Sequence, residues 1–573
     1  MQNGMNYTPN PGVQTPPPPA YTAQPVQGQP PVPPTGNAVP PVYTVPPVQG
    51  QVPVYPAAPV PPYVVPQPPR RQYTMSQKVF ALLMFVFGYL FMRVFRFEDG
   101  QVGRTVFTLL LLIVSAVYMS NSGVKPGAVA VLSGLAAGVL SLGYAFGLPV
   151  GMSFPLTVVC ILFYAYFVYK AYDTGIERGP GRFFDVELIR ALFVAPFSSW
   201  FSVFPAAFST KGEKNQKISK KLGLILLGLV FSIVPTLIVV AFLSYDKNFT
   251  DLLDRVLAID VLKGDVWSHF SALLLGVPVA MTVYGLWTSG TFKVCRQLTA
   301  QHCAERRTRA RIMPQIVALA TITPVLFIYL LFFISQFGYF TSAFTGVLPK
   351  GYSYAEYARS GFFQLCAVMV LNGILAYLLF LLVRQTGKNG IARLYTALLS
   401  LSTVILAVTA ASKTFLYADF YGLTLRRVSA LCFIVAMGLV FLMLFLQSIV
   451  PKFPFVPVSV LILTLLFGGL MLSNAPAWVS GYNTAHILAG ADWELDEEYF
   501  EQMGPAAIPD AIKLAYSDAE TVSVKTKNAA RDAMYEFEKE MNEDPPRISE
   551  YSLNYLRAAR ASRQREASLQ NGG

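Results

Sequence analysis

Eleven stretches of about 20 residues, each apolar and almost free of charge, follow one another between Val79 and Ser473. A bilayer core about 30 Å thick needs roughly 20 apolar residues in each helix that crosses it, and only helices and closed barrels satisfy every backbone hydrogen bond there. The stretches lack the apolar and polar alternation of barrel strands. The sequence therefore predicts an all-α fold, a polytopic transmembrane helix bundle of about 11 spans.

Composition agrees with this fold class, because 54% of the 573 residues are hydrophobic and only 13% are charged, against about a quarter in an average globular chain. The predicted spans cover 79–96, 104–120, 128–148, 152–170, 222–244, 267–289, 313–338, 362–383, 395–413, 428–449 and 454–473.

Three domains are predicted: a tail over 1–72, a transmembrane helical domain over 73–473, and a small helical extramembrane region over 474–573. The first 69 residues hold 23 of the 42 prolines and no charged side chain. Such a tract cannot bury a core, so we expect a disordered tail. Two Pro-Pro-x-Tyr strings, ending at Tyr21 and Tyr43, resemble ligands of WW domains. A tether and a docking segment for a protein partner both fit this tail.

Basic residues in the flanks of the spans predict the orientation. With a cytoplasmic N-terminus, the inner flanks collect 23 of the 34 Lys and Arg residues that precede position 474. This arrangement predicts a cytoplasmic N-terminus and a C-terminal region outside the membrane. One further uncharged segment, 191–208, contains two prolines and is basic on both sides. We interpret it as a re-entrant or interfacial element, and a twelfth crossing is the alternative.

The last hundred residues carry 10 Lys and Arg against 17 Asp and Glu. Helical periodicity predicts four helices, which cover 496–503, 506–515, 519–541 and 547–568. These helices are a second candidate surface for a protein partner. The basic excess of the chain lies in the short loops of the bundle, so it indicates topology, and we expect membrane lipids and no nucleic acid as partners.

Signatures of common enzymes are missing from the sequence, which contains neither a phosphate-binding GxxxxGK[ST] nor GxSxG, HExxH or GxGxxG. Cys295, His302 and Cys303 share one basic loop, but their spacing and number do not fit a structural zinc site. We therefore expect no metal and no cofactor, and assign no catalytic residue.

A charged cluster is predicted where the outer ends of several spans meet. It comprises Asp246, Glu356, Arg359, Lys413, Asp419, Tyr421 and Arg426. An ammonium group within an apolar helix needs a partner or water, so we expect Lys413 to reach a carboxylate of Asp246, Glu356 or Asp419. A network that fixes helix ends and a binding or catalytic pocket both fit this pattern.

Four strings around these residues resemble a family of bacterial polytopic membrane proteins catalogued as a domain of unknown function. They are LSYDKNFTDLLDRVL, YAEYARSGFFQL, KTFLYADFYGLTLRR and YNTAHILAGADWELDEEYFEQMGPAAIPDAIKLA. The last string matches the family's Tyr-Asn and Leu-Asp-x-x-Tyr motifs at Tyr482, Asn483, Leu495, Asp496 and Tyr499. The resemblance extends over about residues 75 to 565. It implies the architecture and a bacterial plasma membrane but no activity.

We interpret the chain as a non-enzymatic integral membrane protein of the bacterial cell envelope that acts in interaction, sensing or assembly. The alternative is a membrane-embedded transferase or a transporter for a lipid-linked or envelope substrate, which would use the outer charged cluster. The two hypotheses differ in what that cluster must do. A pocket would not tolerate exchange of Arg for Lys, whereas a structural network would recover after paired apolar replacement.

Overall fold

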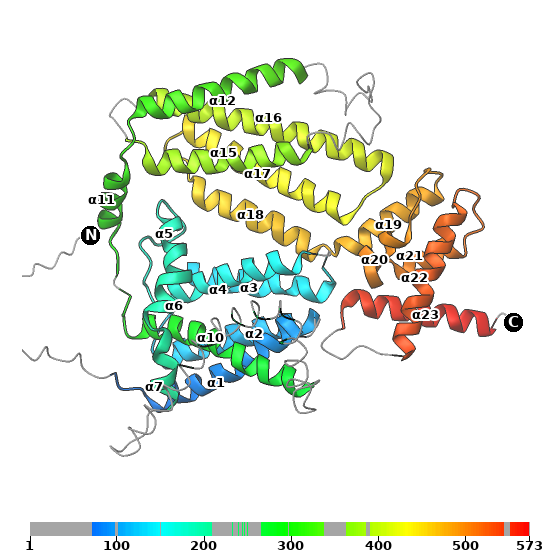
Figure 1. The fold of residues 1–573 in the computed structure, drawn as a ribbon, viewed down its shortest axis with the longest axis horizontal. Helices are drawn as coiled ribbons and strands as arrows, with labels where there is room; N and C mark the ends of the chain where they lie inside the picture. The colour runs from blue at the N-terminus through cyan, green and yellow to red at the C-terminus, as the bar shows by residue number, and fades with distance from the viewer. Residues whose placement is uncertain are drawn as a thin grey trace, which may run out of the picture. The chain divides into compact units, whose positions relative to one another are not determined.

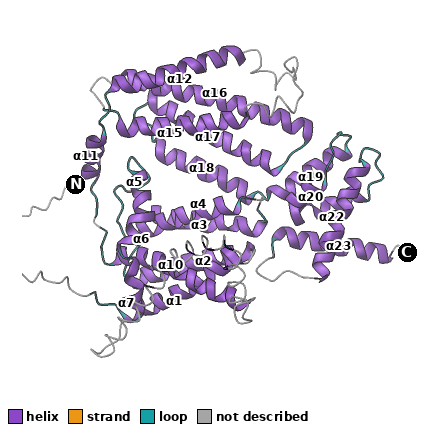
Figure 2. Ribbon diagram, viewed as in Figure 1, coloured by secondary structure: helices purple, strands orange, loops and turns teal. Residues whose placement is uncertain are grey.

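The computed structural model describes residues 71–97, 101–148, 151–208, 265–295, 297–336, 362–384, 390–543 and 551–571, with single residues between 228 and 249. These parts of the chain are helical, and their β pairing is limited to an isolated bridge between Met313 and Val383 (Figure 2). The all-α prediction is confirmed. The proline-rich tail and the predicted span 222–244 lie outside the described ranges, apart from single residues of that span.

One group of helices contains α1 (Met75–Met92), α2 (Gln101–Asn121), α3 (Ala128–Phe146), α4 (Ser153–Ala171) and α10 (Asp265–Thr291) (Figure 1). Its core is aromatic: Trp287 is fully buried, stacks on Tyr118 at a centroid distance of 4.6 Å, and donates to the hydroxyl of Tyr164 at 3.1 Å. Helix α1 crosses α10 where Gly88 meets Gly276, and a Cβ on Gly88 would lie 2.1 Å from the Gly276 carbonyl oxygen. Small residues allow such close crossings in membranes.

The second group contains α12 (Gln315–Gln336), α15 (Phe362–Leu382), α16 (Gly390–Tyr421), α17 (Leu425–Ile449) and α18 (Phe455–Leu472). A buried polar chain links three of these helices, because Tyr329 donates to Asn372 at 2.6 Å and Asn372 donates to Thr403 at 2.9 Å. Side-chain hydrogen bonds of this kind hold helices together in lipid. Helix α18 also packs against α3, which joins the two groups.

Ten helices in the described part of the chain are long and apolar enough to cross a membrane. They match ten of the eleven predicted spans, and the chain is a multi-pass integral membrane protein. The largest difference is at α16, which continues to Tyr421 although the prediction ended at Lys413. Residues 414–421 contain no helix breaker, and the helix stops only at Gly422, where φ is +72°.

The segment 191–208 forms part of a bent element made of α5 (Phe184–Ile189), η2 (Arg190–Val194), α6 (Ala195–Ser198), η3 (Trp200–Ser202) and α7 (Val203–Ala207). The axis bends by 45° between α6 and η3. Trp200 donates to Thr282 of α10 at 3.1 Å, and the hydroxyls of Ser202 and Thr288 lie 2.7 Å apart. In Figure 1 the element runs across the spans at one end of the first group. Its re-entrant or interfacial character stays a prediction.

The C-terminal region contains α19 (Ala475–Leu488), α20 (Glu497–Met503), η4 (Gly504–Ala507), α21 (Ile508–Ala515), α22 (Val524–Glu543) and α23 (Leu553–Asn571). The four predicted helices are present, with the second divided between η4 and α21. Helix α19 was not predicted. It follows α18 after a tight turn at Asn474, where φ is +51°, and the moderate apolarity of its residues gave no separate signal.

Candidate functional site

Those residues of the predicted outer cluster that the structure describes occupy different environments. Lys413 is buried near the C-terminal end of α16. Asp419 and Tyr421, in the last turns of the same helix, are exposed, and so is Arg426 at the start of α17. The turn between α16 and α17 therefore places four of the seven residues on two consecutive helix ends, with only Lys413 turned into the bundle.

The other three members of the predicted cluster come from other parts of the chain. Asp246 is exposed, and its carboxylate accepts a hydrogen bond from the backbone amide of Phe249 at 2.9 Å, which closes a local turn. Glu356 and Arg359 lie outside the described residues. The expected approach of a carboxylate to Lys413 stays a prediction.

Arg427, the neighbour of Arg426, makes the contacts that order this turn. Its guanidinium carbon lies 4.0 Å from the centroid of the Tyr417 ring. It also donates to the backbone carbonyls of Tyr421, at 3.0 Å, and Gly422. Successive residues of a helix point about 100° apart, so only one of the two arginines turns back over the end of α16. A sequence motif with two adjacent arginines does not show which one.

Asn483 of α19 holds the same turn from the other side. It is 1% exposed, and its side chain makes both hydrogen bonds to the backbone of Leu423, accepting from the amide at 2.8 Å and donating to the carbonyl at 2.7 Å. The amide group also donates to the hydroxyl of Tyr499 at 3.1 Å. One side chain thus connects the α16–α17 turn to α19 and α20.

Tyr499 is the residue of α20 that Asn483 contacts. Asp496 caps α20 by accepting from the backbone amide of Tyr499 at 2.9 Å. Burial raises the pKa of Tyr499 to about 12, so the hydroxyl is neutral at physiological pH. We call the following residues the outer motif hub, after the face on which their motifs were predicted to lie: Tyr417, Tyr421, Gly422, Leu423, Thr424, Arg427, Asn483 and Tyr499.

An aromatic stack lies beside the hub. Trp493 stacks on His486 at 5.3 Å between centroids, and His486 lies 4.0 Å from the ring centroid of Tyr482. A Cβ on Gly422 would come within 3.1 Å of the Trp493 ring, so glycine permits both the positive φ and the close approach. Tyr482 and His486 are exposed. Aromatic side chains where a helix leaves a bilayer are typical of the membrane boundary.

A second polar network, which the sequence did not reveal, lies where α4 meets α5. Glu187 is 1% exposed and accepts from the ammonium group of Lys170 at 2.7 Å and from the Tyr166 hydroxyl at 2.9 Å. The backbone amides of Ile176 and Glu177 also donate to it, at 2.6 Å and 3.0 Å. The loop after α4 thus folds around one carboxylate. Lys170 ends the predicted span 152–170, and nothing in the sequence pairs it with Glu187.

Helix α11 (Ala300–Ala310) joins this end of the bundle through Arg307. Its guanidinium group donates to both carboxylate oxygens of Asp185, at 2.9 Å and 2.8 Å, and lies between the rings of Phe183 and Phe380. Tyr377 of α15 donates to the same carboxylate at 3.0 Å. These contacts tie α5, α11 and α15 together.

Cys295 and Cys303 were expected to share one loop, but Cys303 lies within α11 and only Cys295 precedes this helix. Cys295 is buried and accepts from the guanidinium group of Arg190 at 2.9 Å, and burial raises the pKa of the Cys303 thiol. Among the described residues, no group of three His, Cys, Asp or Glu side chains is arranged to hold a metal ion.

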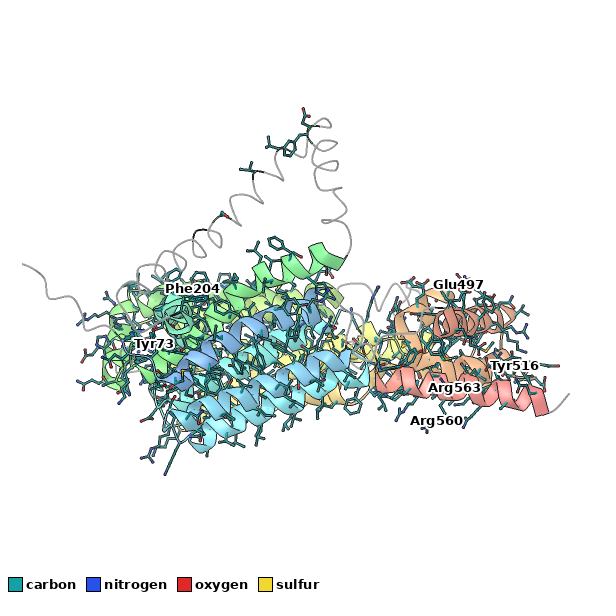
Figure 3. The ribbon with its side chains drawn as sticks, turned by 90° about the horizontal axis from the view of Figure 1, so that it is seen from below. Tyr73, Phe204, Glu497, Tyr516, Arg560 and Arg563 are labelled. Atoms are coloured by element: carbon teal, nitrogen blue, oxygen red, sulfur yellow. The ribbon has the colours of Figure 1, made fainter. Side chains whose placement is uncertain are left out.

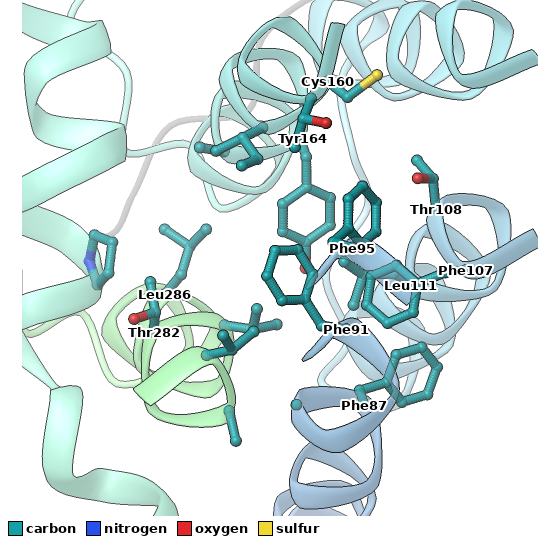
Figure 4. Close-up of a pocket in the computed structure, with 18 of the residues that line it drawn as sticks. Phe87, Phe91, Phe95, Phe107, Thr108, Leu111, Cys160, Tyr164, Thr282 and Leu286 are labelled. Atoms are coloured by element: carbon teal, nitrogen blue, oxygen red, sulfur yellow. The ribbon is translucent and has the colours of Figure 1, made fainter. Parts of the chain in front are cut away.

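Apolar pockets lie between the described helices, including the following two. One, of about 320 Å³, lies in the first group, where phenylalanines of α1 and α2 face Tyr164 and Thr282 (Figure 4). The other, of about 800 Å³, is a cleft between α3, α4 and α5 on one side and α17 and α18 on the other. Both are lined almost entirely by carbon, so they suit hydrocarbon rather than a charged substrate.

Comparison with family models shows to which family the chain belongs. The model of a family described as a domain of unknown function, DUF4153, matches residues 106–514. The chain belongs to the DUF4153 family. No match was found among curated proteins or solved structures.

The DUF4153 match begins in α2 and ends in α21, so it is shorter at both ends than the resemblance predicted from the motifs. The outer motif hub and the Lys170–Glu187 network both fall inside it. The proline-rich tail, α1, α22 and α23 fall outside it. The hub is therefore built from the part of the chain that the family model covers.

Proposed function

We propose that this DUF4153 protein is a non-enzymatic membrane protein of the bacterial plasma membrane that acts in interaction or assembly, with its C-terminal helices outside the cell. The observation that carries the proposal is the pairing of polar groups within the outer motif hub. Asn483 binds the backbone of Leu423, and Arg427 binds the carbonyls that end α16. Groups used in this way position one part of a protein on another.

The distribution of charge supports the proposed orientation. Helix α11 contains three arginines, and a fourth, Arg311, directly follows it. This helix lies at the opposite end of the spans from α19 (Figure 1). Short loops rich in Lys and Arg remain in the cytoplasm. The end that carries α11 is then cytoplasmic, and the hub and the C-terminal helices are outside.

The proposed partner surface lies on α23. Arg557, Arg560 and Arg563 are exposed and spaced by three residues, which places them along one side of the helix. Arg560 and Arg563 point away from the other helices (Figure 3). Arg565 instead pairs with Glu538 of α22 at 3.2 Å. The proposed partner is an acidic protein of the cell envelope. The proline-rich tail is a second candidate site for a protein partner.

Photo-crosslinking in living cells tests this proposal. A benzophenone side chain placed at the exposed Leu556, next to Arg557, should give one discrete adduct. Replacing Arg557, Arg560 and Arg563 together by glutamate should abolish it, and Asn483→Ala should weaken it by loosening the hub. The same probe at Tyr535, which is 70% exposed on α22, is the matched control. Equal adducts at both positions, or none at Leu556, would contradict the proposal.

The alternative function, a transferase or transporter for a lipid-linked or envelope substrate, rests on Lys413. A charged side chain buried in a span is expensive and often marks a functional site. This alternative predicts that Lys413→Met abolishes binding of a lipid-linked anion to the purified protein while leaving the hub intact. A role in interaction or assembly predicts that this variant retains the crosslinked adduct.

A further inference from the structure

A buried arginine lies at the end of the bundle that carries α11. Arg311 directly follows this helix and is 8% exposed. Its Nε and Nη2 atoms are buried and, among the described residues, have no hydrogen-bond partner. Leaving a guanidinium group buried without an anion is costly, because the lost hydration is not replaced. Within the described part of the chain, the site thus contains donors without an acceptor.

The surroundings of Arg311 are strongly positive. Arg384 donates to the backbone carbonyl of Arg311 at 3.2 Å, and Arg307 donates to the carbonyl of Arg182 at 2.8 Å. Burial lowers the pKa of Arg311, and the charges of Arg182 and Arg307 lower it further. The carboxylate of Asp185 already accepts hydrogen bonds from Arg307 and from Tyr377, so it does not neutralise Arg311.

Next to Arg311, apolar side chains are exposed on the outside of the bundle. Ile312 and Ile316, which follow Arg311 into α12, are 67% and 74% exposed. On α15, Phe380 is 41% exposed and lies under Arg307. A surface of this kind faces acyl chains in a membrane protein. Guanidinium donors without an acceptor at its edge fit a phosphate group, which arginine binds by two parallel hydrogen bonds.

We propose that Arg182, Arg311 and Arg384 bind the phosphate group of an anionic phospholipid, whose acyl chains lie along the exposed surface of α12 and α15. A bound headgroup would supply the acceptors that Nε and Nη2 of Arg311 lack, and so would fix α11 and α15 at the membrane boundary. This lipid site does not depend on the role proposed for the outer motif hub.

Native mass spectrometry of the purified full chain tests the proposal. The probes are phosphatidylglycerol and phosphatidylcholine with the same acyl chains, added to the protein in detergent. Wild-type protein should retain phosphatidylglycerol at least tenfold more strongly than phosphatidylcholine. Arg311→Gln should remove this preference, and Arg384→Gln, at an exposed position, should weaken it severalfold. Arg309→Gln, exposed on α11, is the matched control and should bind as wild type.

Two further measurements distinguish a bound phospholipid from a free anion and from an arginine that only supports the fold. Millimolar inorganic phosphate should not displace phosphatidylglycerol, and displacement would overturn the lipid assignment in favour of a free-anion site. Without lipid, Arg311→Gln should be at least as heat-stable as wild type, because it removes a buried charge for which the described residues offer no acceptor. Added phosphatidylglycerol should raise the melting temperature of the wild type but not that of Arg311→Gln. Unchanged lipid preference in both Arg311→Gln and Arg384→Gln would overturn the proposal.

Discussion

Replacing Asn483 by alanine should release the C-terminal region from the bundle. The side chain makes three hydrogen bonds, two to Leu423 and one to Tyr499, and is almost fully buried. At about 1 kcal/mol for each bond, the substitution should destabilise this attachment by about 3 kcal/mol. Because 1.4 kcal/mol corresponds to a factor of ten, the open form should become roughly a hundredfold more populated.

Limited proteolysis in detergent measures this population, since cleavage follows the open fraction when opening is fast. The cleavage sites should fall within α19 to α22. Asn528→Ala is the matched control, because Asn528 is exposed on α22 and the same atoms are removed. Its effect should stay within about twofold, as for most surface substitutions. If Asn483→Ala is cleaved at a rate within about threefold of wild type, the hub does not hold this region.

Three other perturbations test the rest of the structure. Glu187→Gln should destabilise the first helical group by about 3 to 5 kcal/mol because it leaves Lys170 buried without its anion, and replacing both by methionine should recover most of the loss in thermal unfolding. The C-terminal region should lose stability as pH rises from about 10 towards 12, because burial raises the pKa of Tyr499 from 10 in the unfolded chain to about 12. Tyr499→Phe should flatten this pH dependence of unfolding, measured by circular dichroism. Deleting residues 1–69, which carry no charge, should leave the melting temperature in detergent nearly unchanged.

The spans could be predicted from the sequence because the bilayer imposes a length and a polarity on each of them separately. Ten of the eleven predicted spans are present as apolar helices. Their ends were less certain, since polar and aromatic residues remain compatible with a helix after it leaves the apolar core. At α16 this added two turns beyond Lys413.

Contacts between distant positions could not be predicted in the same way. Asn483 and Leu423 are 60 residues apart. The motifs that contain them indicated a family resemblance in each segment but not a contact between the two segments. Glu187 was missed because a single carboxylate in a short helix has no pattern. Arg426 was selected although Arg427 makes the contacts that order the turn, since the choice depends on the rotation of α17.

The proposed topology is tested most directly by measuring on which side of the membrane each end of the bundle lies. Single cysteines at the exposed positions Glu540 on α22 and Gln301 on α11, in a chain without its native cysteines, can be labelled in intact cells with an impermeant maleimide. We predict labelling at 540 in intact cells and at 301 only after the cells are permeabilised. Labelling at 301 but not at 540 would contradict this orientation.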